Sequence, residues 1–478
     1  MQIKINNKKY KTKEGETILD VCRRENIPIP TLCAHGKLKR EAVCRLCLVE
    51  IVETGLKPVS TGKLVPSCAF PVCEKLEVTT ESEKIKKARE INMELLWSDH
   101  AGKCVKCRKN RSCEMQNLAE EYKIENFHFV PRKESITDLE ERDLLKDNKQ
   151  RVVVDDKNPV ILRTTEYCVE CRRCINICPV KAYGFNNRAG DVVVGTPYNK
   201  TLDCIFCGAC VKYCPTAALT DQNNQEKIDN ELKDLNKLSI AIVDPAIFGD
   251  SEDASDQKIK EGKLAGVLSE LGFEKVFMLD LGLQKYADKL SEEIKINLGK
   301  KTIFNSNCAA FSLYIQKFQP EFSDNLSRIS IPDELMAENL KTEYARAEKI
   351  DPKKIVIISI SSCTAKKGLK LNYLDYVLTA RELGKMIQIN NIDLDKIKEG
   401  VIDGERIKGI EDMAIFGGTS SKISEKNNIH GQHKFACANG INETKEILAN
   451  IKKEKARYNF IECMICPGGC INGGGNAM

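Results

Sequence analysis

The stretch Glu462–Gly475, E-C-M-I-C-P-G-G-C-I-N-G-G-G, lies near the C-terminus, and the interpretation of the whole chain depends on it. It places Cys466 and Cys470 four residues apart and follows them with three glycines. Thiolates at i and i+4 can face one metal centre, and glycines let a backbone approach a bulky group without a Cβ clash. We therefore expect a large thiophilic group here, although a zinc loop or a frayed terminus also fits this stretch taken alone.

The composition favours metal ligation by thiols. The chain has 478 residues, too many for one ordinary core, and contains 23 Cys but 5 His. The cysteines cluster in C-x-x-C runs and no apolar signal segment begins at Met1, so we expect metal binding in a reducing cytoplasm, not a secreted disulfide framework. Interspersed Lys and Glu indicate no nucleic-acid partner, and the apolar runs are too short for direct membrane insertion.

The first domain is expected over residues 1–80 and is β-rich. Alternation at Ile3–Ile5, a turn at Asn6-Asn7 and the run Thr17–Val21 predict a hairpin followed by a helix. The C-x10-C-x2-C-x20-C spacing of its thiols suits a [2Fe-2S] cluster, with zinc as the alternative. These thiols are Cys33, Cys44, Cys47 and Cys68. The stretch resembles the plant-type ferredoxin module that begins iron-only hydrogenases and the large iron-sulfur subunit of respiratory complex I, which implies a β-grasp fold.

A small second module is expected over residues 81–125. One imidazole and three thiolates have the spacing H-x3-C-x2-C-x5-C, which can hold either a [4Fe-4S] cluster or zinc. These ligands are His100, Cys104, Cys107 and Cys113. Both families just named carry a His-ligated cluster at this point, so the resemblance favours the cluster. Residues 126–160 are rich in Lys, Glu and Asp, and we expect a solvated connector there.

An internal repeat over residues 161–225 is the strongest local signal in the sequence. Two runs have the form C-x2-C-x2-C-x3-C-P, which is typical of bacterial ferredoxins with two [4Fe-4S] clusters. In that module the fourth Cys of each run ligates the other cluster. One predicted ligand set is Cys168, Cys171, Cys174 and Cys214, and the other is Cys204, Cys207, Cys210 and Cys178.

The remaining residues, 226–478, read as a parallel α/β domain. Apolar runs at Leu238–Val243 and Ile355–Ile360 predict strands, Gly262–Leu271 predicts an amphipathic helix, and Asn223–Lys237 predicts a charged one. Single thiols far apart in the sequence could build a site between two lobes, or each could be a core cysteine. They are Cys308, Cys363, Cys437, Cys463, Cys466 and Cys470.

Three segments of this domain resemble the catalytic domain of [FeFe]-hydrogenases. Asn305–Phe311 stands where that family has T-S-C-C-P-x-W, and Ser362–Lys367 stands where it has P-C-x-x-K. The C-terminal stretch matches E-x-M-x-C-x-G-G-C-x-x-G-G-G. Together with the N-terminal modules, the resemblance covers nearly the whole chain. It implies an α+β multidomain protein that ends in a two-lobed α/β iron-hydrogenase domain.

The resemblance also implies a cofactor, the H-cluster. Its [4Fe-4S] cube would be held by Cys308, Cys363, Cys466 and Cys470, and Cys470 would bridge to a two-iron unit with CO, cyanide and dithiolate ligands. Lys366 would donate a hydrogen bond to one cyanide. The pocket residues would be Met464, Phe416, Pro245, Gly473 and Gly474. The full set would be one [2Fe-2S] cluster, three [4Fe-4S] clusters, one of them His-ligated, and the H-cluster.

The chain departs from the family on its proton route. The proton-delivering cysteine before the first ligand is Asn307 here, and an amide neither ionises nor protonates readily at neutral pH. The glutamate expected next on the route aligns with Leu290, while Ser327 and Glu293 occupy later positions. We therefore expect an interrupted proton route and low turnover.

Three functions fit these observations. The first is an [FeFe]-hydrogenase, linked to ferredoxin or NAD, that interconverts H2 with protons and electrons. The second is a regulatory subunit that senses H2 or redox state, and the third is an electron-transfer subunit that keeps only the cube. The accessory modules imply a hetero-oligomer with ferredoxin or a flavin- and NAD-binding subunit as redox partner. No G-x-G-x-x-G motif follows a strand, so we expect no nucleotide site in this chain.

Overall fold

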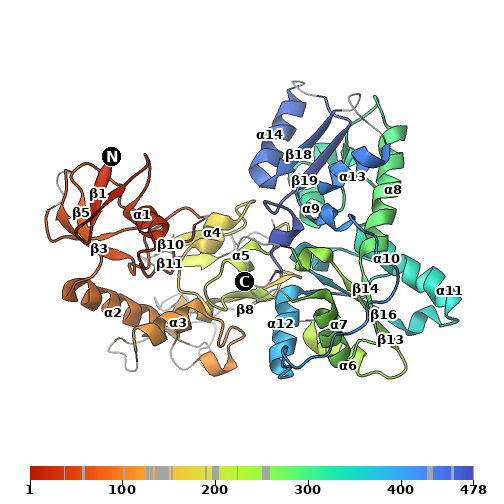
Figure 1. Cartoon of the computed structure of the whole chain (residues 1–478), viewed down its shortest axis with the longest axis horizontal. Coiled ribbons are helices and arrows are strands. Elements are labelled where there is room, and N and C mark those ends of the chain that lie inside the picture. The colour runs from red at the N-terminus through yellow and green to blue at the C-terminus, as the bar shows by residue number, and fades with distance from the viewer. Residues whose placement is uncertain are drawn as a thin grey trace. The chain divides into compact units, whose positions relative to one another are not determined.

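The computed structural model of the chain contains two compact units (Figure 1). The first comprises residues 1–157, 162–201 and 213–220, and the second comprises residues 158–161, 202–212 and 221–478. The structure describes residues 1–36, 38–55, 60–98, 100, 103–124, 129, 133–134, 150–151, 154–188, 191–195, 204–222, 224–249, 259–427, 434–453 and 457–476. Most of the predicted connector over 126–160 lies outside the described residues.

A five-stranded sheet with the order β2-β1-β5-β3-β4 begins the first unit. β1 pairs antiparallel with β2 and parallel with β5, and α1 packs its apolar side chains on the sheet, as in a β-grasp fold. Thr17 and Asp20 form a capping box that fixes the start of α1. The predicted hairpin and helix are thus confirmed. The bounds are β1 Gln2–Ile5, β2 Lys8–Lys11, α1 Ile18–Arg24, β3 Leu48–Glu53, β4 Leu64–Pro66 and β5 Glu77–Thr79.

Short elements follow the sheet. α3 begins at Glu114, as the sequence predicts, and Arg173 of α4 binds the Glu114 carboxylate through two nitrogens at 2.7 and 2.8 Å. β9 lies between β8 and β12 in a three-stranded sheet, β10 and β11 form a hairpin, and β6 pairs with β7. The bounds are α2 Glu83–Ser98, α3 Glu114–Glu121, β6 Lys133–Glu134, β7 Gln150–Arg151, β8 Val154–Asp155, β9 Ile161–Thr164, α4 Arg173–Ile177, β10 Gly184–Arg188, β11 Asp191–Gly195 and β12 Leu219–Asp221.

A parallel four-stranded sheet, β14-β13-β16-β17, forms the centre of the second unit. Ile240 and Ile242 of β13 pack on one side with α8 and α10, while Ala241 and Val243 pack on the other with α7 and α12. Both faces are covered, which explains why β13 and β16 are continuous apolar runs. The bounds are β13 Leu238–Val243, α7 Glu261–Glu270, β14 Lys275–Met278, α8 Asp280–Ile296, α10 Pro332–Asn339, α11 Ala345–Ala347, β16 Ile355–Ser361, β17 Tyr376–Thr379 and α12 Ala380–Ile389.

A second parallel sheet, β15-β19-β18, completes this unit, with α13 and α14 beside it (Figure 1). The two sheets form the two-lobed α/β arrangement expected from the sequence. The charged helix predicted at Asn223–Lys237 is shorter, because α6 ends at Leu232. In the described part of the chain, no helix has the length and apolar character required to span a membrane. The bounds are α5 Ala209–Lys212, α6 Gln225–Leu232, β15 Ile303–Phe304, α9 Ala309–Phe318, α13 Gly418–Asn427, β18 Phe435–Asn439, α14 Gly440–Lys452 and β19 Phe460–Met464.

Candidate metal centres

Four buried thiols converge in the first domain. Cys33 follows α1, Cys44 and Cys47 precede β3, and Cys68 follows β4. Hydrogen bonds from Cys44 and Cys68 lower the pKa of Cys33 to about 2, while the shared hydrogen bonds raise the pKa of Cys44 and of Cys68. Sulfurs this close cannot all ionise without a cation between them. The donor set therefore fits a [2Fe-2S] cluster, whose iron replaces the protons.

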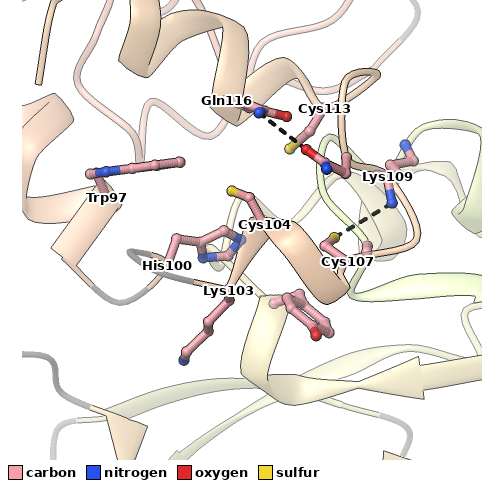
Figure 2. A pocket seen from close by; sticks show the side chains of 11 residues that line it. Trp97, His100, Lys103, Cys104, Cys107, Lys109, Cys113 and Gln116 are labelled. Atoms are coloured by element: carbon pink, nitrogen blue, oxygen red, sulfur yellow. Dashed lines mark hydrogen bonds between the residues drawn. The ribbon is translucent and has the colours of Figure 1, made fainter.

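The predicted His and Cys ligands of the second module surround one pocket (Figure 2). Cys104 and Cys107 lie at a 3₁₀ turn, Cys113 caps α3, and His100 follows α2. The backbone N–H of Lys109 donates to the Cys107 sulfur at 3.4 Å, and the Cys113 thiol donates to the Pro215 carbonyl at 3.5 Å. The structure therefore brings all four residues together, although their ligation of a cluster stays a prediction.

The first set of the ferredoxin repeat also lies together. Burial raises the pKa of Cys174, and the negative charges of Cys171, Cys168 and Cys214 raise it further. Cys214 belongs to the second run, so its proximity to the first run supports the exchange of fourth ligands. The assignment of Cys178 to the other cluster stays a prediction.

Four half-buried cysteines form a cradle in the second unit. Cys308 follows β15, Cys363 follows β16, and Cys466 and Cys470 follow β19, so three parallel strands deliver their thiols to one edge. The charges of Cys363 and Cys308 act on both Cys466 and Cys470, which places the four sulfurs near one another. The cradle thus unites residues that are remote in the sequence.

The cradle fits a [4Fe-4S] cube by its chemistry. Burial raises the pKa of Cys363 to about 11 and that of Cys466 to about 12, so the thiols need a cation to ionise. Backbone N–H groups already serve the sulfurs: those of Ile465, Phe311 and Ala310 bond to Cys308. Hydrogen bonds of this kind are common around cluster thiolates.

The second ferredoxin run packs directly on the cradle. The charge of Cys466 raises the already burial-raised pKa of Cys207, so these two sulfurs are neighbours. A Cβ at Gly474 would collide with the Cys207 carbonyl oxygen, and Thr364 Oγ1 donates to the Phe206 carbonyl at 2.8 Å. Lys317 donates to the Cys204 carbonyl at 2.7 Å. Electrons on this run therefore have a short path to the cradle.

Lys366 lies beside the cradle with two partners that sequence reasoning missed. Its Nζ is 2.9 Å from Asp244 Oδ2 and 2.8 Å from Asp333 Oδ2. Burial opposes the charge of Lys366, but the two carboxylates raise its pKa well above the ordinary value. Asp244 ends the loop after β13 and Asp333 follows Pro332 at the start of α10. Carboxyl ends of parallel strands are common sites of function, which is the one signal that could have identified Asp244.

The other predicted pocket residues are close to these elements. Pro245 begins the turn after Asp244, Met464 is buried at the end of β19, and the N–H of Phe416 donates to the Gly468 carbonyl at 3.2 Å. Gly473 and Gly474 contact protein backbone, since a Cβ on Gly473 would collide with the Ser362 carbonyl oxygen. The close approach expected of these glycines is therefore to polypeptide, while their role in cofactor binding stays a prediction.

The predicted proton-route residues form two separate groups. Ser327 Oγ donates to Glu293 Oε2 at 2.6 Å, whereas Leu290 is fully buried in the apolar core around α8. Asn307 accepts a hydrogen bond from Asn305 Nδ2 at 2.7 Å and donates one to Thr419 Oγ1 at 3.2 Å. In the described residues, no three His, Cys, Asp or Glu side chains are placed to hold a single metal ion.

Four family profiles match the chain. Residues 237–474 match the iron only hydrogenase large subunit, C-terminal domain, and residues 1–83 match a 2Fe-2S iron-sulfur cluster binding domain. Residues 89–128 match the NADH-ubiquinone oxidoreductase-G iron-sulfur binding region, and residues 167–219 match a 4Fe-4S dicluster domain. The fold and these domains define an iron-sulfur oxidoreductase.

Individual relatives agree. The chain is 28% identical to iron hydrogenase 1 of Clostridium pasteurianum, over 98% of this chain and 88% of the relative. It is also 28% identical to the NADP-reducing hydrogenase subunit HndD of Solidesulfovibrio fructosivorans, over 99% of this chain and 88% of the relative. A solved apo [FeFe]-hydrogenase variant from Chlamydomonas reinhardtii matches at 20% identity and a TM-score of 0.43, covering 53% of this chain and 84% of that chain. The chain belongs to the iron-only hydrogenase family.

Proposed function

We propose that this protein is an [FeFe]-hydrogenase that interconverts H2 with protons and electrons. One observation carries the proposal: four thiols from separate strands form a cradle, and a buried lysine lies beside it. A cube alone needs the thiols but gains nothing from a buried ammonium. An anionic ligand next to the cube would give Lys366 a use, since charge-assisted hydrogen bonds to anions are strong.

We propose the following division of labour among the residues. Cys308, Cys363, Cys466 and Cys470 hold the cube, and Pro245, Phe416 and Met464 enclose the adjoining space, with Gly473 and Gly474 behind it. The two-iron unit supplies, when bound, the metal chemistry that forms and splits H2. The protein's part is to exclude water, bind anions and bring electrons and protons.

Electrons would reach the cradle through the accessory modules. We propose one [2Fe-2S] cluster in residues 1–80, a His-ligated [4Fe-4S] cluster in 81–125, two further [4Fe-4S] clusters in 161–225, and the H-cluster in 226–478, with a connector at 126–160. The proximity of Cys207 to Cys466 supports the last step of this path. Because both cysteines are buried among backbone contacts, little reorganisation would accompany the transfer of an electron.

Protons would need a route other than the family's. Ser327 and Glu293 are hydrogen-bonded, but Leu290 offers no exchangeable proton. A cavity of about 480 Å³ is lined by Ser306, Ser312 and Ser327, and it reaches Ala309 next to the first cradle cysteine. A polar cavity of this size can hold several waters. We propose that water in this cavity carries protons past Leu290.

We propose that the protein works in a hetero-oligomer. Two relatives or profiles name subunits of larger enzymes, the NADP-reducing hydrogenase subunit HndD and the NADH-ubiquinone oxidoreductase-G region. The chemistry of the N-terminal clusters suits one-electron exchange with ferredoxin or with a flavin- and NAD-binding subunit. All 23 cysteines are free thiols in the structure, which suits a reducing compartment such as the cytoplasm.

Infrared spectroscopy tests the proposed function. Protein matured with the hydrogenase assembly machinery should show CO and cyanide bands, and it should evolve H2 from reduced viologen. The Cys470→Ser variant is the matched control and should lose the bands, because the two-iron unit would lose its bridge to the cube. A wild-type spectrum without either band would refute the proposal and favour a cube-only electron carrier.

A further inference from the structure

The ammonium of Lys366 is held between two buried carboxylates, so the site beside the cradle has more negative than positive charge. The side chains of Lys366 and Asp244 are each 6% exposed, and that of Asp333 is 0% exposed. Two carboxylates and one ammonium leave one negative charge without a cation in the group. Such a charge is felt strongly where water cannot screen it.

Hydrogen bonds hold each carboxylate in place. Ser361 Oγ donates to Asp244 Oδ2 at 3.0 Å, and the Ala246 N–H donates to Asp244 Oδ1 at 3.0 Å. Ser359 Oγ donates to Asp333 Oδ1 at 2.5 Å. Buried ions are tolerated when their remaining lone pairs are satisfied in this way. The group therefore looks built to keep both carboxylates ionised.

The group is connected to the cradle through backbone and side chain. Ser361 Oγ, which donates to Asp244, also accepts the N–H of Cys363 at 3.2 Å. The N–H of Lys366 bonds to the Cys363 sulfur, and the charge of Asp244 acts on the Cys470 thiol. Asp244 is thus linked to two of the four cradle cysteines.

We propose that Asp244 and Asp333 are positioning residues that lower the reduction potential of the cube in the cradle, while they fix the ammonium of Lys366. The proposal rests on the proposed function, since it requires the cube. An added electron costs more next to a net negative charge than next to a neutral group. The pair would therefore favour electron transfer from the cube toward a strongly reducing reaction, such as the reduction of protons.

A redox titration of the full-length protein tests this inference. Protein reconstituted with iron and sulfide, without the two-iron unit, would be titrated with dithionite and mediators and followed by electron paramagnetic resonance. A Cys308→Ser variant identifies the signal of the cradle cube by altering it. The readout is a potential, which a purely structural role of Asp244 would not move in a fixed direction.

The decisive variant is Asp244→Asn, which keeps the shape and removes the charge. We expect the equilibrium constant for reduction of this cube to rise about tenfold, a positive shift of about 59 mV for one electron. Asp280→Asn is the control: Asp280 is also buried, but it binds Arg406 Nε at 2.8 Å and the Ile407 N–H at 2.9 Å. The control should leave the cradle cube unchanged.

The possible outcomes separate this inference from the proposed function. A cradle cube with the same potential in wild type and Asp244→Asn overturns the inference alone. The absence of a cradle signal in the wild type overturns the proposed function and this inference with it. Should Asp244→Asn fail to fold, Asp333→Asn must give the same positive shift, and a negative or zero shift there counts against the pair.

Discussion

Asn307 is fixed at both ends of its amide, which distinguishes it from a residue that relays protons. Asn305 donates to its oxygen, its nitrogen donates to Thr419, and its backbone N–H donates to the Tyr286 hydroxyl at 3.1 Å. The amide therefore acts as a bracket between β15 and α13. A thiol at this position would lose the two amide bonds and gain an exchangeable proton.

We expect Asn307→Cys to raise H2 evolution from reduced viologen at least about tenfold, because general acid catalysis contributes roughly 10²–10⁴-fold. The lost amide hydrogen bonds should cost about 1–3 kcal/mol of stability. Asn307→Ala loses the same bonds without providing a thiol, so it separates the two effects. Equal rates for wild type and both variants would contradict an interrupted route at this residue.

Single residues differ in how far the sequence could predict their role. Asn307 stands next to a cradle cysteine inside a motif, so its departure from the family could be recognised from the sequence. Asp244 and Asp333 carry no motif, and only the pairing of β13 with β16 and the packing of α10 bring them to Lys366. Ion pairs between remote elements depend on tertiary packing, which local sequence does not encode.

At the scale of elements, the C-terminal glycine run seals the contact between the cradle and the second ferredoxin run. Gly474 lies against the Cys207 carbonyl and Gly208, and Gly208 in turn lies against the Thr364 side chain. The backbones approach so closely that no side chain fits. These glycines therefore contribute to the join between two iron-sulfur segments of one unit.

We expect Gly474→Ala to destabilise the protein by about 1–3 kcal/mol, because the new Cβ meets rigid backbone. Thermal unfolding under anaerobic conditions, with iron content measured in parallel, would detect both the loss of stability and any loss of clusters. Gly384→Ala is the matched control, since Gly384 lies within α12 with no atom within 4 Å of an added Cβ. It should be neutral or stabilising by roughly 0.5–1 kcal/mol. Equal melting of both variants would argue against a tight join.

The elements most open to prediction were those with a strong apolar pattern. Leu238–Val243 and Ile355–Ile360 were predicted as strands and form β13 and the first six residues of β16. β15 has two residues, Ile303 and Phe304, and no local pattern could identify it. Its place in the second sheet depends on pairing with β19, a contact between segments far apart in the sequence.

At the scale of the whole molecule, the cores differ in their dependence on iron. The core beneath α2 and α3 includes four predicted ligands among its buried residues, namely Cys33, Cys44, Cys113 and Cys171. The two large cores on either side of β13 and β16 contain no cysteine among the described residues. Metal binding supplies folding free energy where ligands form the core, and apolar burial supplies it elsewhere.

Removal of iron should therefore unfold the molecule unevenly. After anaerobic treatment with a strong chelator, we expect amide hydrogens of α2 and α3 to lose most of their protection, because unbound thiols replace the cluster that anchors their core. Amides of β13 and β16 should stay protected, since their apolar packing is independent of iron. Hydrogen exchange read by mass spectrometry measures both regions in one sample, so each serves as the control for the other. Simultaneous loss of protection in the helices and in β13 and β16 would contradict this division, and would mean that the cradle cluster stabilises the central sheet as well.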